Sequence, residues 1–186
     1  MFSPSPHFMF CSGMQEKAQP VSHKSELRFR REVYRKDVEK MAKWMQDDEI
    51  TEHLNESQNI HRKLKKISQH SSLPIFSHYF NQDGTFFVIT RPEHGPIGFL
   101  RLASKDEGAE IVVVIGERTQ WGNGFGYRAV KKGLRHVFFE WREDQVIAKI
   151  HDENERSKHV FRKAGFTHDK DLESEEQFSI TVDDYL

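Results

Sequence analysis

The chain has 186 residues, a length typical of one domain and sufficient to bury a core without disulfide bonds or a structural metal. Its 28 Lys and Arg residues nearly balance 29 Asp and Glu residues, so a formal net charge of −1 offers no basic field for nucleic acid or anionic lipid. The 15 Phe and 3 Trp residues argue against intrinsic disorder, and the single Cys11 excludes a disulfide framework and a cysteine-rich zinc site.

The N-terminal segment differs in composition from the rest of the chain. Residues 1–24 carry three prolines and no sustained hydrophobic period, which predicts a mobile extension ahead of one domain over residues 25–186. The apolar stretch at 8–11 lacks a basic flank, and the longest apolar run, 111–115, is too short to cross a membrane. We therefore expect a cytoplasmic protein with no membrane partner.

The next segment predicts one strand followed by helices. Apolar residues alternate over 26–33, which favours a short strand, and then recur at helical spacing from 38 to 45. Acidic residues open a short helical piece over 47–54, and a second helix is predicted over 60–67. Four basic side chains lie on the outer face of that second helix: Arg62, Lys63, Lys65 and Lys66. A solvated helix face explains them better than a phosphate site does.

Strands dominate the middle of the chain. Apolar runs at 86–89, 96–102 and 111–115 are separated by short turns rich in glycine and proline, which predicts an antiparallel meander. The five residues of 111–115 are all apolar, so this strand is covered on both faces and lies at the centre of the sheet.

The last part of the chain alternates helices and strands. Apolar residues at helical spacing predict a helix from Val130 to Trp141, and a strand follows over 145–150. A second helix runs from Asn154 and stops at Gly165. Residues 166–168 and a polar, acidic loop then precede the closing strand over 178–182. The whole order predicts an α/β (α+β) domain in which helices flank a mixed sheet.

A glycine-rich loop over 121–127 carries the clearest chemical signal. Gly122, Gly124 and Gly126 alternate between the central strand and the helix that contains Val130. Alternate glycines let successive N–H groups converge, and the following helix presents its positive N-terminus, so the loop suits a pyrophosphate. An ordinary tight turn is the alternative, and the position between strand and helix favours the anion site.

Two other phosphate-binding loops fit this segment poorly. A Walker loop needs Gly-Lys-Ser/Thr, whereas Tyr127 and Arg128 follow Gly126 here. A dinucleotide-binding Rossmann fold requires repeated βαβ units around its glycines, whereas this loop follows a predicted antiparallel meander. Neither alternative is favoured.

These residues resemble the GNAT superfamily of CoA-dependent N-acyltransferases. The pyrophosphate loop of that family reads Arg/Gln-x-x-Gly-x-Gly/Ala. A branch that includes ribosomal-protein N-terminal and small-molecule amine acetyltransferases writes it Trp-Gly-x-Gly-x-Gly after Ile-Gly-Glu/Asp. This chain has Ile115-Gly116-Glu117 followed by Trp121-Gly122-Asn123-Gly124-Phe125-Gly126. Residues 154–166 are similar to a second family segment, Asn-x-x-Ala/Ser…Tyr-x-Lys-x-Gly-Phe. With a fainter match at 44–50, the resemblance covers residues 26–186.

The resemblance implies a mostly antiparallel sheet that splays open between the strand ending at Ile115 and the strand over 146–150. Acetyl-CoA would lie in the opening as a co-substrate, without a metal. Its pantetheine arm would pair with strand backbone, and loop amides would hold its pyrophosphate. The implied binding residues are Val113, Val114, Ile115, Trp121, Gly122, Asn123, Gly124, Phe125, Gly126, Tyr127, Asn154, Ser157 and Phe161.

One departure from the family pattern concerns the chemistry. The family's usual acid for the departing thiolate is a Tyr seven residues after the motif Asn, and that position is Phe161 here. Ser157 is the available hydroxyl on the same helix, either as a catalytic acid or as a small residue that admits the co-substrate. The acceptor amine must lose a proton, and Glu110 is the first candidate for the base and Glu117 the second. The alternative for both residues is a charged side chain at a strand end that faces water.

The sequence therefore predicts transfer of an acetyl group from acetyl-CoA to a primary amine of a small molecule or a protein N-terminus. The alternative is a module that binds acyl-CoA without turnover, which Phe161 keeps open. Five acidic residues lie in the region that shapes the acceptor side in the family: Asp47, Asp48, Glu49, Glu52 and Glu56. A cationic acceptor and a solvated acidic helix both fit them. The 11 His residues show no metal-binding spacing, and a homodimer is compatible with the resemblance.

Overall fold

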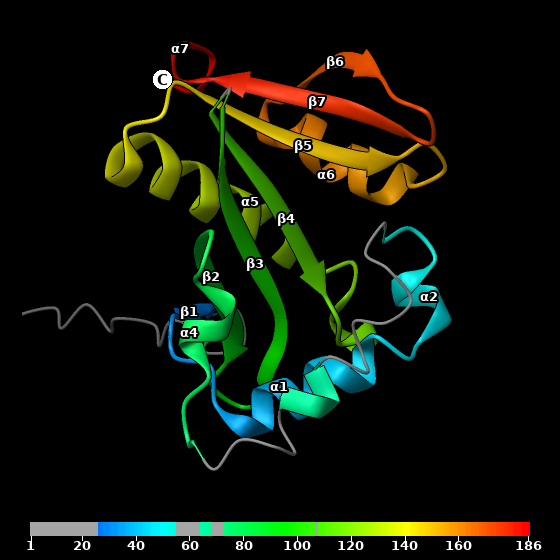
Figure 1. Ribbon diagram of the computed structural model, residues 1–186. Coiled ribbons are helices and arrows are strands. Elements are labelled where there is room, and N and C mark those ends of the chain that lie inside the picture. The colour runs from blue at the N-terminus through cyan, green and yellow to red at the C-terminus, as the bar shows by residue number, and fades with distance from the viewer. Residues whose placement is uncertain (1–25, 55–63, 68–72, 107) are drawn as a thin grey trace, which may run out of the picture.

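The computed structural model describes residues 26–54, 64–67, 73–106 and 108–186. Its strands form a single sheet in the order β1-β2-β3-β4-β5-β7-β6 (Figure 1). The strands are β1 (Arg28–Arg30), β2 (Gly84–Arg91), β3 (Gly95–Lys105), β4 (Gly108–Ile115), β5 (Gln145–His151), β6 (Thr167–Asp171) and β7 (Glu175–Thr181). The predicted extension over 1–24 lies outside the described residues.

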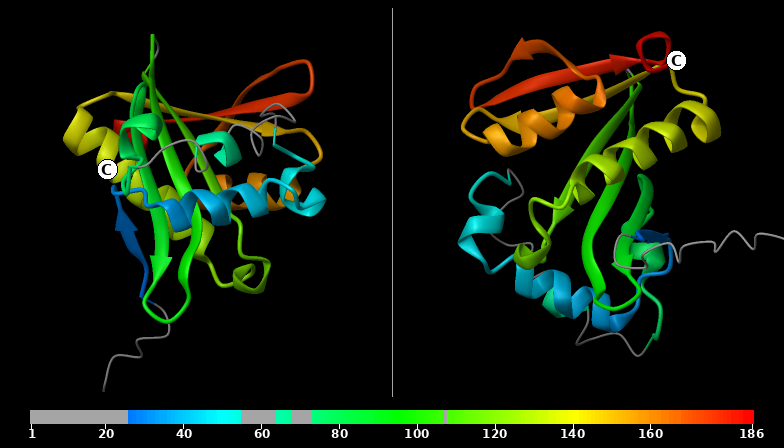
Figure 2. Two further views of the ribbon diagram at one scale, coloured as in Figure 1. Left: turned by 60° about the horizontal axis from the view of Figure 1, so that its bottom comes forward. Right: turned by 180° about the vertical axis from the view of Figure 1, so that it is seen from behind.

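Helices cover both faces of the sheet. In Figure 2, α5 and α6 lie behind the strands as seen in Figure 1, and α1 crosses the opposite face. The helices are α1 (Arg35–Trp44), α2 (Asp48–Thr51), a turn at 64–67, α4 (Ser77–Phe80), α5 (Phe125–His136), α6 (Glu155–Ala164) and α7 (Val182–Tyr185). A 3-10 turn, η2 (Arg118–Gln120), precedes α5, and a π-helical turn, η3 (Val137–Trp141), follows it. Among the described residues, none of the helices is long and apolar enough to cross a membrane.

The antiparallel meander of β2, β3 and β4 is confirmed, and β4 is the fourth of seven strands. Its side chains enter two different clusters because helices cover both faces: Ile111 packs beneath α5, whereas Val114 packs beneath α1. The continuous apolar run of β4 therefore follows from its place in the sheet.

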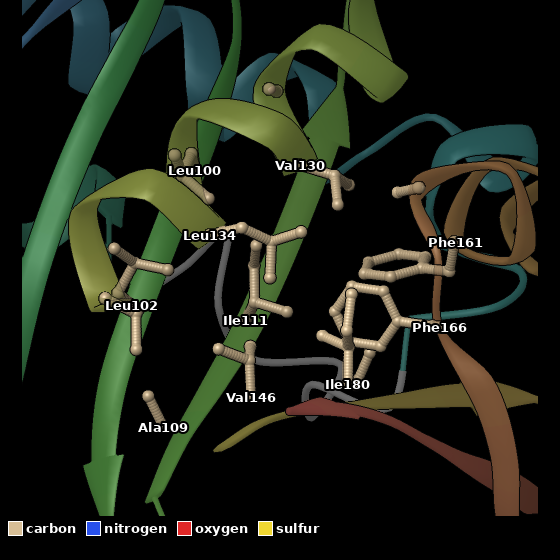
Figure 3. Close-up of a cluster of buried hydrophobic side chains, with 14 of the residues drawn as sticks. Leu100, Leu102, Ala109, Ile111, Val130, Leu134, Val146, Phe161, Phe166 and Ile180 are labelled. Carbon is tan, nitrogen blue, oxygen red and sulfur yellow. The ribbon is translucent and has the colours of Figure 1, made fainter. Parts of the chain in front are cut away.

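The larger core lies between the sheet and the two helices α5 and α6 (Figure 3). Leu100 and Ile111 from the strands meet Leu134 from α5, and all three side chains are buried. A Cβ atom built at Gly133 would lie 2.5 Å from Ile111 Cδ1, so this glycine lets α5 approach β4 closely. The helix is thereby fixed to the strand that precedes the glycine-rich loop.

The sheet opens between β4 and β5. These two strands run parallel, and their pairing in the described residues is limited to Ala109 with Val146 and Glu110 with Ile147. Beyond Glu110 the two strands diverge, while β4 stays paired with β3 as far as Ile115. The splay that the resemblance implies is therefore confirmed, and beyond this point Val112, Val113 and Ile115 are only partly buried.

Several elements differ from the prediction. The helix predicted to end at Trp141 begins at Phe125, and its last part winds as the π-helical turn η3. The acidic segment before the closing strand was expected to be a loop, but it contributes most of β6. All side chains of this edge strand are exposed and four of its five residues are charged or histidine, so it carries no apolar alternation. Of the predicted helix over 60–67, only 64–67 lies within the described residues, and these four are helical.

Candidate active site

A cavity of about 450 Å³ lies where β4 and β5 separate. All of the cofactor-binding residues that the sequence predicts, except Asn123, line it. The sequence reasoning did not anticipate several further lining residues: Ile50, Leu54, Gln120, Arg156, His159, Val160 and Lys163. The cavity thus has one wall from the glycine-rich loop and α5, a second from α6, and a third from the α2 region.

The glycine-rich loop bends through left-handed backbone conformations at Gly122 and Gly124, whose φ angles are +77° and +74°. A Cβ atom at either position would meet no protein atom within 4 Å, so the backbone is open to an approaching ligand. Gly124 is the N-cap of α5, and the first amides of that helix have no carbonyl partner within it. Unpaired amides at a helix N-terminus are an arrangement that can bind an anion, and the anion site itself stays a prediction.

Side chains of the loop hold its shape. The indole N–H of Trp121 donates a hydrogen bond to the Ile115 carbonyl at 2.6 Å, which ties the loop to the end of β4. The Asn123 amide donates to the carbonyls of Gln120 and Trp121, both at 3.1 Å. Asn123 therefore braces the loop from outside the cavity and does not line it.

A buried polar pair supports the loop from within the protein. The Arg91 guanidinium donates to Gln120 Oε1 at 2.6 Å, and both side chains are buried. The same guanidinium lies 5.0 Å from the centre of the Phe125 ring, at the start of α5. This pair links β2 to the loop across the protein, and nothing in the local sequence around either residue signals it.

The backbone of β4 supplies a second binding element. The Ile115 carbonyl accepts the hydrogen bond from Trp121, which lines the cavity, so this carbonyl is directed toward the cavity. Residues two apart in a strand direct their N–H and C=O groups to the same edge, so Val113 also faces the opening. With β5 turned away, this edge can pair with an extended amide-bearing ligand.

On α6, the predicted residues have different local roles. The Asn154 side-chain oxygen accepts a hydrogen bond from the Ser157 N–H at 3.0 Å and thereby caps the helix, leaving its NH₂ group for a ligand. Ser157 is half-buried and lines the cavity. Phe161 is 4% exposed and packs edge-on against Phe166, with the ring centres 5.0 Å apart.

The charge of the cavity is positive. Among the residues the structure describes, no carboxylate lines it, whereas Arg156 and Lys163 do. The Arg156 guanidinium stacks 3.6 Å above the centre of the Trp121 ring. Burial lowers the pKa of Arg156, and the nearby Glu49 carboxylate opposes that shift, so the guanidinium remains charged at neutral pH. The lining therefore suits an anionic ligand.

The two candidate bases lie outside the lining of the cavity. Glu110 sits at the paired end of β4 and β5, with Lys105 at 3.8 Å and Lys149 at 3.9 Å from its carboxylate. Glu117 pairs with Lys40 at 3.1 Å. The structure thus brings together the predicted cofactor residues and Ser157, and leaves both carboxylates apart from them.

Two of the acidic residues near α2 are paired with a cation. Arg118 lies 2.5 Å from a Glu49 carboxylate oxygen and 3.8 Å from one of Asp47. The Asp47 side chain also caps α2 by accepting from the Glu49 N–H at 3.1 Å. Glu56 lies outside the described residues. The negative charge that the sequence suggested for an acceptor is therefore partly neutralised.

The sheet splays open, and a glycine-rich loop and a helix N-terminus lie at its opening. A model of the GNAT acetyltransferase domain matches residues 27–167, so the chain belongs to the GNAT acetyltransferase family. No curated protein sequence matches the chain. The family resemblance and the fold class predicted from sequence are confirmed.

Solved structures of similar fold include a spermidine N-acetyltransferase from Vibrio cholerae in complex with CoA and spermine. It is 17% identical, with a TM-score of 0.71 over 87% of this chain and 98% of that one. A dodecameric structure of the same enzyme is 16% identical, with a TM-score of 0.66 over 87% and 97% of the two chains. A domain from Methanocaldococcus jannaschii DSM 2661 is 18% identical, with a TM-score of 0.66 over 84% and 99%. These likenesses concern the fold.

Proposed function

We propose that this protein transfers an acetyl group from acetyl-CoA to a primary amine. The observation that carries the proposal is the cavity between β4 and β5, which joins an open strand edge to a glycine-rich loop. A ligand with an extended amide arm and a pyrophosphate needs both the strand edge and the loop in one cavity. Membership of the GNAT family supports acetyl transfer, and the positive lining supports CoA as the donor.

In this proposal, each wall of the cavity has a part in the reaction. Amides from Gly122 to Tyr127 bind the pyrophosphate, and the Val113 backbone pairs with the pantetheine arm. These contacts fix the thioester beside α6, where a neutral amine attacks its carbonyl carbon in a ternary complex. Phe161 packs against the arm, since its buried ring lines the cavity but carries no proton to donate.

Two proton transfers accompany the reaction. We assign the proton given to the departing thiolate to Ser157, the hydroxyl side chain on the α6 wall of the cavity. The attacking amine loses its proton to solvent at the cavity mouth, because no carboxylate lines the described part of the cavity. The role of Glu110 as a base stays a prediction.

The acceptor is an amine of a small molecule or a protein N-terminus. Polyamines are one class to test, because similar folds include spermidine N-acetyltransferases. The pairing of Arg118 with Glu49 and Asp47 weakens the case for a polycation at α2. A homodimer and a cytoplasmic location remain part of the proposal.

A second candidate function is acyl-CoA binding without turnover, which the phenyl ring at Phe161 favours. CoA release measured with a panel of polyamines, amino sugars, aminoglycosides and peptides separates the two. Amine-dependent release, with an acetylated product found by mass spectrometry, supports the transferase. Tight acetyl-CoA binding without release for any amine would establish the binding module, and absence of acetyl-CoA binding would refute both.

A further inference from the structure

We propose that His53, His151 and Glu153 form a site for a divalent transition metal at the edge of the cavity. One ring nitrogen of each histidine and one carboxylate oxygen of Glu153 all lie within 4.8 Å of one another. The residues come from two distant parts of the chain: His53 follows α2, whereas His151 ends β5 and Glu153 lies in the loop that follows, before α6. Their spacing in the sequence therefore matches no metal-binding motif.

His53 has a ring nitrogen that lacks a partner. Its Nδ1 atom is buried and has no hydrogen bond to any residue the structure describes. Its other nitrogen, Nε2, lies 3.8 Å from a carboxylate oxygen of Glu52. A buried nitrogen without a partner is unfavourable, and a metal ion would satisfy it.

His151 has a similar arrangement. Its Nδ1 atom lies 3.0 Å from Asp152 Oδ1, and the Glu153 N–H lies 3.3 Å from the same nitrogen. In this structure Nδ1 accepts the hydrogen bond from the Glu153 N–H. A metal-bound histidine commonly donates its second ring N–H to a carboxylate, so a metal ion on Nε2 would replace this contact by an Nδ1–H donated to Asp152. The centres of the two imidazole rings lie 5.3 Å apart, and the ring planes are tilted by 35° to each other.

The donor set indicates which ion would bind. Two imidazole nitrogens and one carboxylate oxygen suit Zn²⁺ and similar ions, whereas Mg²⁺ and Ca²⁺ prefer oxygen ligands. Ligand atoms at ~2.1 Å from a tetrahedral zinc ion lie roughly 3.4 Å apart, so the widest pair would have to close by about 1.4 Å. Glu153 is exposed, so its carboxylate is free to rotate toward the two rings.

The position of the triad gives the ion a structural consequence. Ile50 and Leu54, on either side of the α2 end, line the cavity, and so do Asn154 and Ser157 at the start of α6. Figure 1 shows α2 beside the end of β5, across the opening of the sheet. An ion bound here would connect the α2 wall of the cavity to the α6 wall, whichever ligand the cavity binds.

The test is a competition titration of Zn²⁺ on the untagged, metal-free, full-length protein against a chromophoric chelator. We expect one Zn²⁺ per chain at this site, and at least ~10-fold weaker binding after His53→Gln or His151→Gln. His168→Gln is the matched control, since His168 is exposed on β6, pairs with Asp171 and lies outside the triad. This control should bind zinc as the wild type does, which would show that loss of a histidine outside the triad does not by itself weaken binding.

Glu153→Gln is a second variant that changes an exposed side chain, whereas His53 and His151 are half-buried. Its carboxylate is exposed, so the change should preserve the far-ultraviolet circular dichroism spectrum while weakening zinc binding by a similar factor. Equal zinc affinity and stoichiometry in the wild type and Glu153→Gln would overturn the proposal, and so would an absence of zinc binding by the wild type. These readouts require no transferase activity.

Discussion

The glycine-rich loop allows a direct test of backbone conformation at Gly124. Gly124→Ala places a side chain where φ is +74°, a left-handed conformation that disfavours residues with a Cβ atom. The cost is about 1–2 kcal/mol, and no contact adds to it, because the Cβ meets no protein atom within 4 Å. For a chain of this length, that cost lowers Tm by roughly 2–8 °C.

Gly126→Ala is the matched comparison. Gly126 lies in the first turn of α5, and its Cβ would contact Val160 methyl groups at ordinary distances of 3.8 and 3.9 Å. Alanine favours the helical conformation over glycine by up to about 1 kcal/mol, so this variant should keep or raise Tm. The two substitutions therefore shift stability in opposite directions, although the glycines are only two residues apart.

Binding of acetyl-CoA provides the second measurement. Gly124 lines the cavity where the pyrophosphate is proposed to lie, and a Cβ atom there would meet no protein atom within 4 Å. We expect Gly124→Ala to weaken acetyl-CoA binding at least ~10-fold in calorimetric titration, which is about 1.4 kcal/mol, and Gly124→Val to weaken it further. Unchanged Tm would refute the backbone argument, and unchanged affinity in a folded variant would refute the pyrophosphate assignment.

Three further predictions concern the chemistry and the stability. If Ser157 protonates the thiolate, Ser157→Ala lowers kcat by ~10²–10⁴-fold with little change in KM for acetyl-CoA. Adding Phe161→Tyr should then restore part of the lost kcat. Near-normal turnover of Ser157→Ala would show that the serine is only a small residue that admits the co-substrate. Glu110→Gln should keep kcat near the wild-type value, because this carboxylate does not line the cavity; a large loss with an altered pH profile would establish it as the base. The hydrogen bond to Glu176 raises the pKa of Lys158 above 10.5, so the contribution of this ion pair is fully present at pH 7 and is lost as the pH rises beyond that value. Lys158→Met should therefore lower the free energy of unfolding at pH 7, with a smaller difference from the wild type above pH 10.5; a constant difference in urea titrations would contradict this.

The sequence by itself determined the elements whose signals are local. Four such signals depend only on neighbouring residues: the alternation of glycines, the Asn154 cap, the helix end at Gly165 and the apolar run of β4. Such patterns reflect backbone dihedral preferences and the burial of one or both faces, which short stretches of sequence encode. They were sufficient to predict the meander, the helix after the glycine-rich loop and membership of the GNAT family.

Only the tertiary structure decided which distant side chains meet. Arg91 reaches Gln120 beneath the loop, Arg156 stacks on Trp121, and His53 approaches His151. The edge strand β6 also lacked a sequence signal, because a strand with no buried face has no apolar period to read.

The placement of Glu110 shows the same limit for a candidate catalytic residue. Its position at the start of the central strand was correct, yet the pairing of β4 with β5 at this point holds it between two lysines and outside the cavity lining. Local sequence constrains the backbone around a residue. The contacts of its side chain depend on how strands that are distant in sequence pair and diverge, and that is a property of the folded sheet.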